Sequence, residues 1–427
     1  MRFYTLILIF VITAGTKSVA FQDDPWIRQV SPVSTVLLNC TFTDTLNGWA
    51  AGDSGVIIHT SNGGNNWIIQ NSTIEYYIND IFFINKRLGW GIANEFLLDG
   101  TTILKTTDGG NLWTAQNFPD SSKIFRTIYF LDSLNGYIGG FQGTIFKTTN
   151  AGSSWIQSSN DSSFFSAFPI AKFAFVTPEI GFACGGQIDI AGVIWQTTDS
   201  GLNWKAEAQS PEPIYDIYFK DPLKIICVGG DFEYGAQIIR SSNNGLNWTY
   251  RNLGLFGQGQ SVDFRTPDEA WMALGFSGTW AITYDGGNNW IEMFTTDTTT
   301  LYSVVFPDSL HGWAVGKDGV ILKYIPVKTG IQNYYTDSPD TYFLNQNYPN
   351  PFNPSTTISY SIPGKEFVSV KIYDVTGKEI VSLVNKLQEA GNHNIYFNGD
   401  NLQSGIYFYT LIADGAIIKT RKMIFLK

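Results

Sequence analysis

Short runs of alternating apolar and polar residues follow one another along most of the chain, and they recur at a nearly fixed distance. A Phe ends one such run in seven places, spaced 41 to 47 residues apart: Phe42, Phe83, Phe130, Phe175, Phe219, Phe264 and Phe306. An apolar residue lies two positions before each Phe, and a small or apolar residue followed by a large apolar one begins six positions after it. Alternation of this kind predicts β-strands. A repeat of this length is typical of a propeller blade of four strands.

The repeats also predict how the ring closes. The seventh repeat stops after its third strand, near Tyr324, and has no fourth strand of its own. The sequence WIRQ at residues 26–29 is similar to WIIQ at 67–70, which opens a fourth strand in the first repeat. We therefore predict that the N-terminal segment supplies the fourth strand of blade seven, which leaves no open sheet edge between the chain ends.

One turn, with the pattern [ST]-x-[DN]-x-G-x-x-W, precedes the fourth strand in six repeats. Its third position holds Asn62, Asp108, Asn150, Asp199, Asn243 and Asp285. Asp and Asn side chains accept hydrogen bonds from the N–H groups of such turns, and the Gly can adopt positive φ. Because Asn serves as well as Asp, we predict a structural role for these residues and not that of a catalytic carboxylate.

The chain begins with a predicted secretory signal at residues 1–20: a basic start, an apolar core and small residues before position 21. No other long apolar run occurs, so no transmembrane segment is expected. Three Cys, at positions 40, 184 and 227, lie in apolar runs. They are expected to be buried thiols, and a single bridge between two of them stays open.

Charge and motif content exclude several classes of function. Residues 21–328 contain 17 Lys and Arg against 29 Asp and Glu, a net charge of −12. A surface this acidic does not suit nucleic acid. The three His are far apart and away from Cys, so no metal site is expected. No nucleotide or dinucleotide fingerprint is present, and no cofactor is expected.

The repeated turn is similar to the Asp-box, or bacterial neuraminidase repeat. With GWAAG at 48–52 and GWAVG at 312–316, the repeat most resembles the photosystem II assembly factor-like propellers over about residues 26–324. The resemblance implies a seven-bladed β-propeller, which we place at residues 21–325, and it implies no particular activity. Sialidases share the turn, but their three substrate-binding Arg have no counterparts among the six Arg of this region: Arg28, Arg87, Arg126, Arg240, Arg251 and Arg265.

A second resemblance covers the C-terminus, after a polar linker at 326–342. Alternating strands separated by Gly, Asn and Asp turns predict a small Ig-like β-sandwich at residues 343–427. The segment is similar to the type A sorting domain of the type IX secretion system. The matching residues are Asn347, Tyr348, Pro349, Asn350, Pro351, Phe352, Asn353, Pro354 and Gly405. The resemblance implies the type IX secretion machinery as a partner, export across an outer membrane, and release or attachment at the cell surface.

The sequence thus predicts an all-β, secreted or cell-surface binding or scaffold module that is not an enzyme. A glycan-active hydrolase on the same propeller is the alternative. The predicted binding face is built from the loops between second and third strands and would bind a glycan or a protein. Its candidate residues are Glu95, Phe96, Phe141, Asp189, Asp231, Phe232, Glu233, Tyr234 and Phe276. These residues are also compatible with ordinary solvated loops.

Overall fold

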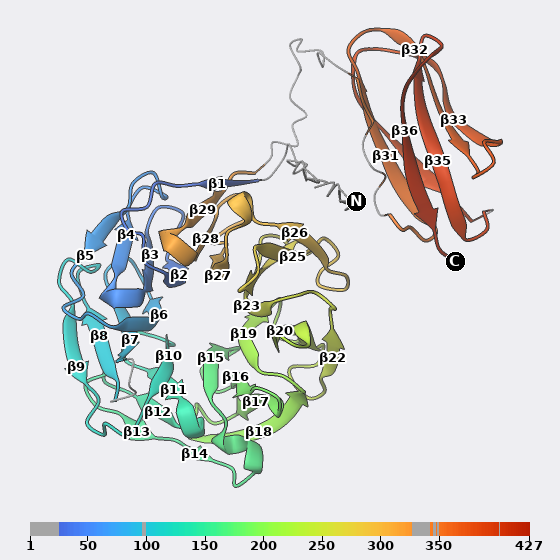
Figure 1. Cartoon of the computed structure of the whole chain (residues 1–427). Helices are drawn as coiled ribbons and strands as arrows, with labels where there is room; N and C mark the ends of the chain where they lie inside the picture. Colours follow the sequence, from blue (N-terminus) through green and yellow to red (C-terminus); the bar gives the residue numbers. More distant parts are fainter. Residues whose placement is uncertain (1–24, 96–99, 327–341, 345–346, 348–349, 401) are drawn as a thin grey trace, which may run out of the picture. The chain divides into compact units, whose positions relative to one another are not determined.

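The computed structural model describes residues 25–95, 100–326, 342–344, 347, 350–400 and 402–427. The chain divides into two compact units, Met1–Val327 and Lys328–Lys427. In the first unit, seven sheets of mainly antiparallel strands stand around a central axis (Figure 1). In the second unit, two further sheets contribute to one core. The predicted all-β class, with a seven-bladed propeller followed by a β-sandwich, is confirmed.

The blades follow one another along the chain, each from its innermost strand outward. Blade 1 contains β2 (Leu37–Phe42), β3 (Gly48–Gly52), β4 (Ile57–Thr60) and β5 (Ile68–Gln70), and blade 2 contains β6 (Tyr77–Phe83), β7 (Gly89–Asn94), β8 (Thr102–Thr106) and β9 (Thr114–Asn117). Blade 3 contains β10 (Phe125–Phe130), β11 (Gly136–Gly140), β12 (Ile145–Thr148) and β13 (Ile156–Gln157), and blade 4 contains β15 (Ile170–Phe175), β16 (Gly181–Gln187), β17 (Ala191–Thr197) and β18 (Asn203–Ser210). Blade 5 contains β19 (Ile214–Phe219), β20 (Ile225–Asp231), β21 (Gly235–Ser241) and β22 (Thr249–Asn252), and blade 6 contains β23 (Gln258–Phe264), β24 (Ala270–Gly275), β25 (Thr279–Thr283) and β26 (Ile291–Phe294). Blade 7 contains β27 (Leu301–Val305), β28 (Gly312–Gly316) and β29 (Ile321–Tyr324), and its fourth strand is β1 (Trp26–Arg28). Short 3₁₀ turns occupy Asp53–Gly55, Phe141–Gly143, Phe164–Ala167, Thr296–Thr298 and Lys317–Gly319.

The Phe and Gly columns of the sequence meet at the seams between blades. The Phe83 ring lies over Gly89 of its own blade, where a Cβ atom would come within 2.5 Å of the ring. The other face of the ring stacks on Trp49 of blade 1, with the ring centroids 3.7 Å apart. Phe130 repeats this arrangement on Trp90, at 3.5 Å. The Gly is therefore required because it makes room for a ring that joins two neighbouring sheets.

Each Asp-box turn is held by the same three hydrogen bonds. In the blade 6 turn, the Thr283 hydroxyl donates to Asp285 Oδ1 at 2.9 Å and accepts from the Gly287 N–H at 3.0 Å. The Asn289 N–H also donates to Asp285 Oδ1, at 2.8 Å. In blade 1 the Asn62 Oδ1 atom accepts the equivalent two hydrogen bonds, from the Thr60 hydroxyl and the Asn66 N–H. Because only one side-chain oxygen is needed, Asn and Asp are interchangeable here.

The turn also connects neighbouring blades. The residue after the Asp or Asn adopts positive φ in all six turns, for example 59° at both Ala151 and Ser200. This conformation exposes its carbonyl to the preceding blade. The Ala151 carbonyl accepts hydrogen bonds from Trp90 Nε1 at 3.2 Å and Lys105 Nζ at 2.9 Å, and the Ser200 carbonyl accepts from the Tyr137 hydroxyl at 2.7 Å. The repeated turn is therefore an inter-blade joint.

Strand β1 closes the ring on blade 7. It pairs antiparallel with β29, with Trp26 opposite Tyr324. The buried Trp26 side chain stacks on Trp280, with ring centroids 5.0 Å apart, and contacts the edges of Trp271 and Phe306. Chain ends far apart in sequence are thus joined by a strand of three residues that contributes one large apolar side chain.

Blade 4 departs from the repeat by a fifth strand. Residues Ser159–Asn160 form β14, which pairs in parallel with β18 at its outer edge. The Asp161 carboxylate accepts a hydrogen bond from the Ala206 N–H at 3.2 Å and anchors the added segment. The alternation pattern does not predict this strand, because two residues are too few to show a period.

The three Cys lie in the propeller core. Cys40 is on β2, Cys184 on β16 and Cys227 on β20, and all three are buried free thiols. Burial raises the pKa of Cys40 to about 12, although Ser303 opposes the shift by a hydrogen bond. These thiols are therefore protonated and serve as small apolar core groups.

The second unit has one sheet in the order β30 (Phe343–Leu344), β31 (Ser355–Ile362), β34 (Gly391–Asn398). The other sheet has the order β33 (Glu379–Gln388), β32 (Glu366–Tyr373), β35 (Gly405–Ala413), β36 (Ala416–Phe425). Asn350 Oδ1 accepts a hydrogen bond from the Ile424 N–H at 2.7 Å, and the buried Phe352 packs on Phe425. Pro351, Asn353 and Pro354 flank these anchors, and Asn347 is buried, whereas Tyr348 and Pro349 lie outside the described residues. The predicted signal at 1–20 and nearly all of the predicted linker also lie outside them.

A first prediction concerns ring closure. Trp26→Ala removes the buried ring from its aromatic surroundings, and large-to-small core changes of this kind cost about 3–5 kcal/mol of unfolding free energy. Ile27→Ala is the matched control, because the Ile27 side chain is 51% exposed and should change stability by less than about 0.5 kcal/mol. Urea unfolding followed by Trp fluorescence measures both. Equal stability of the two variants would contradict a closing role for β1.

A second prediction separates the two side chains of the Asp-box turn. Thr283→Val leaves the Gly287 N–H without its acceptor and should cost about 1–3 kcal/mol of unfolding free energy. Asp285→Asn keeps the Oδ1 acceptor and loses only the exposed hydrogen bond from Asn289 Nδ2 to Oδ2, at 2.7 Å, so it should cost less than Thr283→Val, at most about 1 kcal/mol. Thermal unfolding of the two variants side by side tests this, and a larger loss in Asp285→Asn would show that the charge itself is needed.

Candidate ligand-binding site at the mouth of the channel

The seven innermost strands share a bulge that shapes the channel. In each of them the register against the second strand skips one residue, as between Phe125 and Thr127 of β10 or Ile214 and Asp216 of β19. A bulge places two consecutive side chains on the same side of a strand. Six blades therefore present adjacent residues to the channel, and blade 3 presents Arg126 alone. The bulged residues are Leu38, Asn79, Arg126, Ala171, Tyr215, Gln260 and Tyr302.

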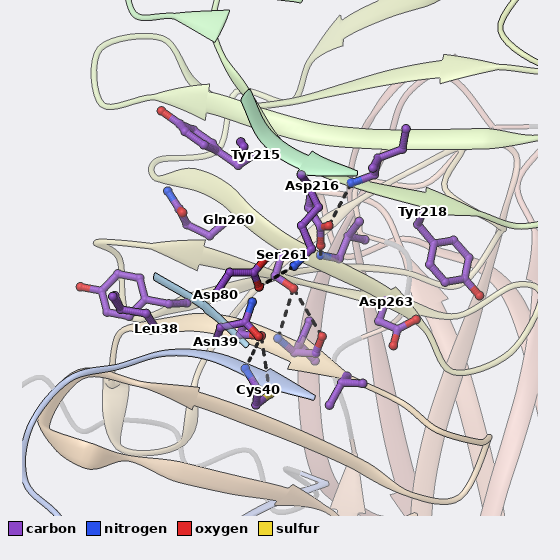
Figure 2. Close-up of a pocket in the computed structure, with 18 of the residues that line it drawn as sticks. Leu38, Asn39, Cys40, Asp80, Tyr215, Asp216, Tyr218, Gln260, Ser261 and Asp263 are labelled. Atoms are coloured by element: carbon purple, nitrogen blue, oxygen red, sulfur yellow. Dashed lines mark hydrogen bonds and ion pairs between the residues drawn. The ribbon is translucent and has the colours of Figure 1, made fainter. Parts of the chain in front are cut away.

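These side chains line a cavity of about 430 Å³ in the channel, with contributions from all seven blades. Figure 2 shows Leu38, Tyr215 and Gln260 at one end of this cavity and Tyr218 and Asp263 at the other. The bulges lie near the start of the inner strands, where the chain enters from the loops that join successive blades. We call this end, with the adjoining loops between second and third strands, the mouth.

The middle of the channel carries a charge cluster from three blades. Lys172 Nζ of blade 4 lies 3.2 Å from Asp80 Oδ1 of blade 2, and so connects two sheets that are not neighbours. Burial disfavours the charge on Lys172, but Asp80 and Asp216 of blade 5 outweigh it and raise its pKa. Burial also raises the pKa of Asp216, and Lys172 opposes that shift.

The channel carboxylates hold neighbouring blades together. Asp80 Oδ2 accepts a hydrogen bond from the Ile128 N–H of blade 3 at 3.1 Å, and Asp216 Oδ2 accepts from Val262 of blade 6 at 2.9 Å. Asp263 Oδ2 accepts from the Phe306 N–H of blade 7 at 2.7 Å. Each carboxylate therefore has a partner on the next sheet, which explains its position without a reaction.

Arg126 is the cation of the mouth. Its guanidinium carbon lies 5.4 Å from the centroid of the Phe141 ring. No ion pair links Arg126 to a carboxylate in the part of the chain that the structure describes. Burial raises the pKa of the neighbouring Tyr215 to about 12, with Arg126 opposing the shift, so the phenol stays protonated. Guanidinium and phenol together can donate hydrogen bonds to a ligand at this end of the cavity.

A row of three aromatic rings leads from the cavity to the surface. Tyr302 lines the cavity on blade 7, and the centroid of its ring lies 5.8 Å from that of Phe276 on blade 6. Phe276 in turn lies 4.6 Å from Phe232 on blade 5, edge to face. Phe232 and Phe276 are 49% and 51% exposed. Contiguous exposed aromatic surface at the entrance of a cavity is typical of a binding site.

Phe276 is held in an unfavourable backbone conformation. Its φ is 70°. The corresponding hairpins of blades 1, 3 and 7 also have a residue at positive φ, but that residue is polar: Ser54, Gln142 or Asp318. A bulky side chain is seldom found there, and such strain costs about 1–3 kcal/mol and gathers at functional sites. The Phe276 side chain therefore lowers the stability of its own turn, while its ring lies in the exposed aromatic row.

Three carboxyl groups meet beside this row. Asp189, Glu212 and Asp231 each place an oxygen within 4.8 Å of the others. Glu212 and Asp231 are only 3% and 4% exposed. Burial raises the pKa of Glu212, and Asp231, Asp189 and Glu233 add to the shift, against a hydrogen bond from the Asp189 N–H. These oxygens are the ones in the described structure that could hold a cation together.

The structure brings some of the predicted binding residues together and separates others. Asp189 joins Asp231, and Phe232 joins Phe276, with Glu233 and Tyr234 in the same hairpin turn. Phe141 lies with Arg126 on blade 3. Glu95 is exposed just after β7 on blade 2 and is not among the residues that line the channel cavity, and Phe96 lies outside the described residues.

Sequence reasoning did not select four residues of the mouth. Arg126, Tyr215 and Tyr302 each lie two positions before the apolar residue that precedes the repeated Phe. Strict alternation therefore places their side chains on the same buried side of the strand as that apolar residue. Only the bulge turns them into the channel, and a bulge has no reliable sequence signature. Glu212 lies in a loop between blades 4 and 5, beside Pro211 and Pro213, and nothing in its surroundings marks it as buried.

Comparison with known families agrees with this architecture. The family model described as "Photosynthesis system II assembly factor YCF48" matches residues 67–212 and 235–325, more than half of the chain. The chain belongs to the YCF48 family. Among its relatives, the photosystem II assembly lipoprotein Ycf48 of Nostoc sp. is 25% identical over 341 residues, which cover 76% of this chain and 94% of that protein.

Solved structures of the YCF48 family have the same fold. One is YCF48 bound to D1 peptide, with a TM-score of 0.58 and 20% identity over 72% of this chain and 98% of that one. The GH74 xyloglucanase of Xanthomonas campestris reaches a TM-score of 0.55 at 12% identity, covering 69% of this chain and 52% of the enzyme. At these identities both likenesses concern the fold alone.

The C-terminal unit matches a different family. The model of the secretion system C-terminal sorting domain covers residues 346–426. The chain is therefore a YCF48-family propeller that carries a sorting domain for secretion. Within the described residues, no helix has the length and apolarity needed to span a membrane.

The channel carboxylates predict how stability depends on pH. Burial raises the pKa of Asp263 to about 7, against hydrogen bonds from the Phe306 and Phe264 N–H groups, and its ordinary value is 3.8. The folded protein thus holds this proton more tightly than the unfolded chain. The contribution of Asp263 to the free energy of unfolding is therefore fully present below about pH 4 and is lost as the pH rises to about 7. Asp263→Asn should remove this loss, so that the wild type loses at least about 1 kcal/mol relative to the variant between about pH 4.5 and 7.5. Urea unfolding across that range measures it, and parallel curves would contradict the raised pKa.

Proposed function

We propose that the propeller is a non-catalytic scaffold that binds a protein segment at the mouth of its channel. The observation that carries the proposal is the exposed aromatic row of Phe232, Phe276 and Tyr302, which runs from the surface into the cavity. Extended segments gain affinity by burying apolar side chains on such rings. The protein would act outside the cell or on its outer surface after export through the type IX machinery.

Two further observations support a protein ligand. The mouth offers hydrogen-bond donors, namely the Arg126 guanidinium, which forms no ion pair among the described residues, and the Tyr215 phenol, and these suit the polar groups of a peptide. The solved family member that holds D1 peptide is a peptide binder on the same fold. That ligand belongs to the other protein, and only the mode of binding, a peptide on a seven-bladed ring, is carried over.

The hydrolase alternative has less support. Glycoside hydrolysis needs two carboxyl groups that flank a bound substrate. In the channel cavity, Asp80, Asp216 and Asp263 each accept a backbone hydrogen bond from the next blade. The carboxyl groups of Asp189, Glu212 and Asp231 are not among those that line this cavity. The likeness to a GH74 xyloglucanase rests on 12% identity and extends only to the fold. Binding therefore accounts for the mouth with fewer assumptions.

The proposal predicts a localised loss of binding in variants of the row. Peptides selected from a random library against the full chain should bind Phe232→Ala and Tyr302→Ala at least about tenfold more weakly, since hot-spot aromatics contribute more than about 1.4 kcal/mol. Phe294→Ala on the outer strand β26 is the control, because Phe294 is an equally large ring that is 70% exposed. Fluorescence anisotropy measures the affinities. Failure to select any binder, or an equal loss in Phe294→Ala, would refute the proposal.

A further inference from the structure

The hairpin between β20 and β21 contributes both to the aromatic row, through Phe232, and to the carboxyl groups of the mouth, through Asp231 and Glu233. Asp231 ends β20, and Phe232, Glu233 and Tyr234 form the turn that leads to β21. Asp231 Oδ1 accepts a hydrogen bond from the Tyr234 N–H at 2.6 Å. Asn252 Nδ2 donates to the Tyr234 carbonyl at 2.8 Å, which ties the turn to strand β22. The exposed Phe232 ring and the carboxylates on either side of it are therefore held in one fixed arrangement.

The negative charge of this arrangement is not balanced within the chain. No ion pair joins Asp189, Glu212, Asp231 or Glu233 to a cation among the residues that the structure describes. Three of these groups lie close together and two are nearly fully buried. Crowding of like charges away from water is costly, and a cation supplied from outside would reduce that cost.

The charge of the whole propeller acts in the same direction. Residues 21–328 contain 17 basic and 29 acidic side chains. Such an excess attracts basic partners over a distance and repels acidic ones. Arg126, the cation on the other side of the mouth, already lies against the Phe141 ring.

We propose that the mouth selects a basic aromatic segment of a partner protein, with a Lys or Arg near an aromatic or large apolar residue. The ring of the partner would lie on Phe232 and Phe276, and its cation would approach Glu233 and the Asp189–Asp231 pair. An extended chain advances about 3.3 Å per residue, so the two side chains would stand within about three residues of each other. This inference rests on the proposed function, which requires only that some protein segment binds at the mouth.

Three synthetic peptides of about a dozen residues test the charge and the ring separately. The first contains Lys beside Trp, the second replaces each Lys by Glu, and the third replaces each Trp by Ser. Anisotropy with the full chain should show binding of the first peptide and at least tenfold weaker binding of the other two. The affinity for the first peptide should fall as salt is added, because screening weakens the attraction.

Variants of the chain assign the effect to particular residues. Glu233→Gln and Asp189→Asn should each weaken binding of the basic peptide at least threefold. Glu292→Gln is the matched control, since it makes the same charge change on β26, away from the mouth. Phe276→Asn should weaken binding at least tenfold while the melting temperature stays the same or rises, because Asn adopts positive φ more readily than Phe. A residue that served only folding would not show a loss of binding together with a gain in stability.

The outcomes separate this inference from the proposed function. Equal affinity for the basic and acidic peptides, or equal effects of Glu233→Gln and Glu292→Gln, would overturn the inference while binding at the mouth still held. Loss of all peptide binding together with failure of the library selection would refute both. If Ca²⁺ alone raised the melting temperature of the wild type but not of Asp189→Asn, and peptide charge had no effect, the carboxylates would form a cation site and the inference would be overturned.

Discussion

The fold depends on hydrogen bonds that run between sheets and not along them. A propeller blade satisfies its own backbone within four strands, so nothing in the strand ladders joins one blade to the next. Here the Asp-box turn supplies that connection, because a residue at positive φ, such as Ala151, directs its carbonyl to donors of the preceding blade. On the inner side, the carboxylates of Asp80, Asp216 and Asp263 make the corresponding connection through backbone N–H groups. The two sets of bonds fix the angle between blades and therefore the width of the channel.

The groups that connect the blades and the candidate ligand contacts lie in different parts of the chain. The connecting groups lie in the Asp-box turns and along the inner strands, whereas Phe232 and Phe276 lie in turns between second and third strands. Among the described residues, no hydrogen bond joins these two turns to a neighbouring blade. Residues there can be exchanged for contact with a ligand at little cost to the ring, and even the strained φ of Phe276 is tolerated on so rigid a support.

Much of the architecture could be predicted from the sequence, and the reason is specific. The Phe-to-Gly-to-aromatic spacing records a physical stack, Phe83 between Gly89 and Trp49, so a repeat in sequence corresponds to a repeat in space. The interchange of Asn62 and Asp108 likewise reflects a single shared acceptor atom. By contrast, Arg126 and Tyr215 reach the channel through a bulge that breaks the alternation on which strand prediction relies. The loop residues of the candidate site could therefore be predicted from their composition, whereas the residues on the inner-strand bulges could not.

Because strand β1 closes the ring, the propeller does not depend on the C-terminal unit for any of its described strands. Every strand of blade 7 comes from residues before 326, and the Ile325 N–H donates to the Pro25 carbonyl at 2.6 Å, so the propeller begins and ends at one point on its rim. Among the described residues, every sheet of the ring consists of strands from the first unit. The strands of the propeller and those of the sorting domain therefore form separate sheets, so cleavage of the chain between the two units would remove no strand from the ring.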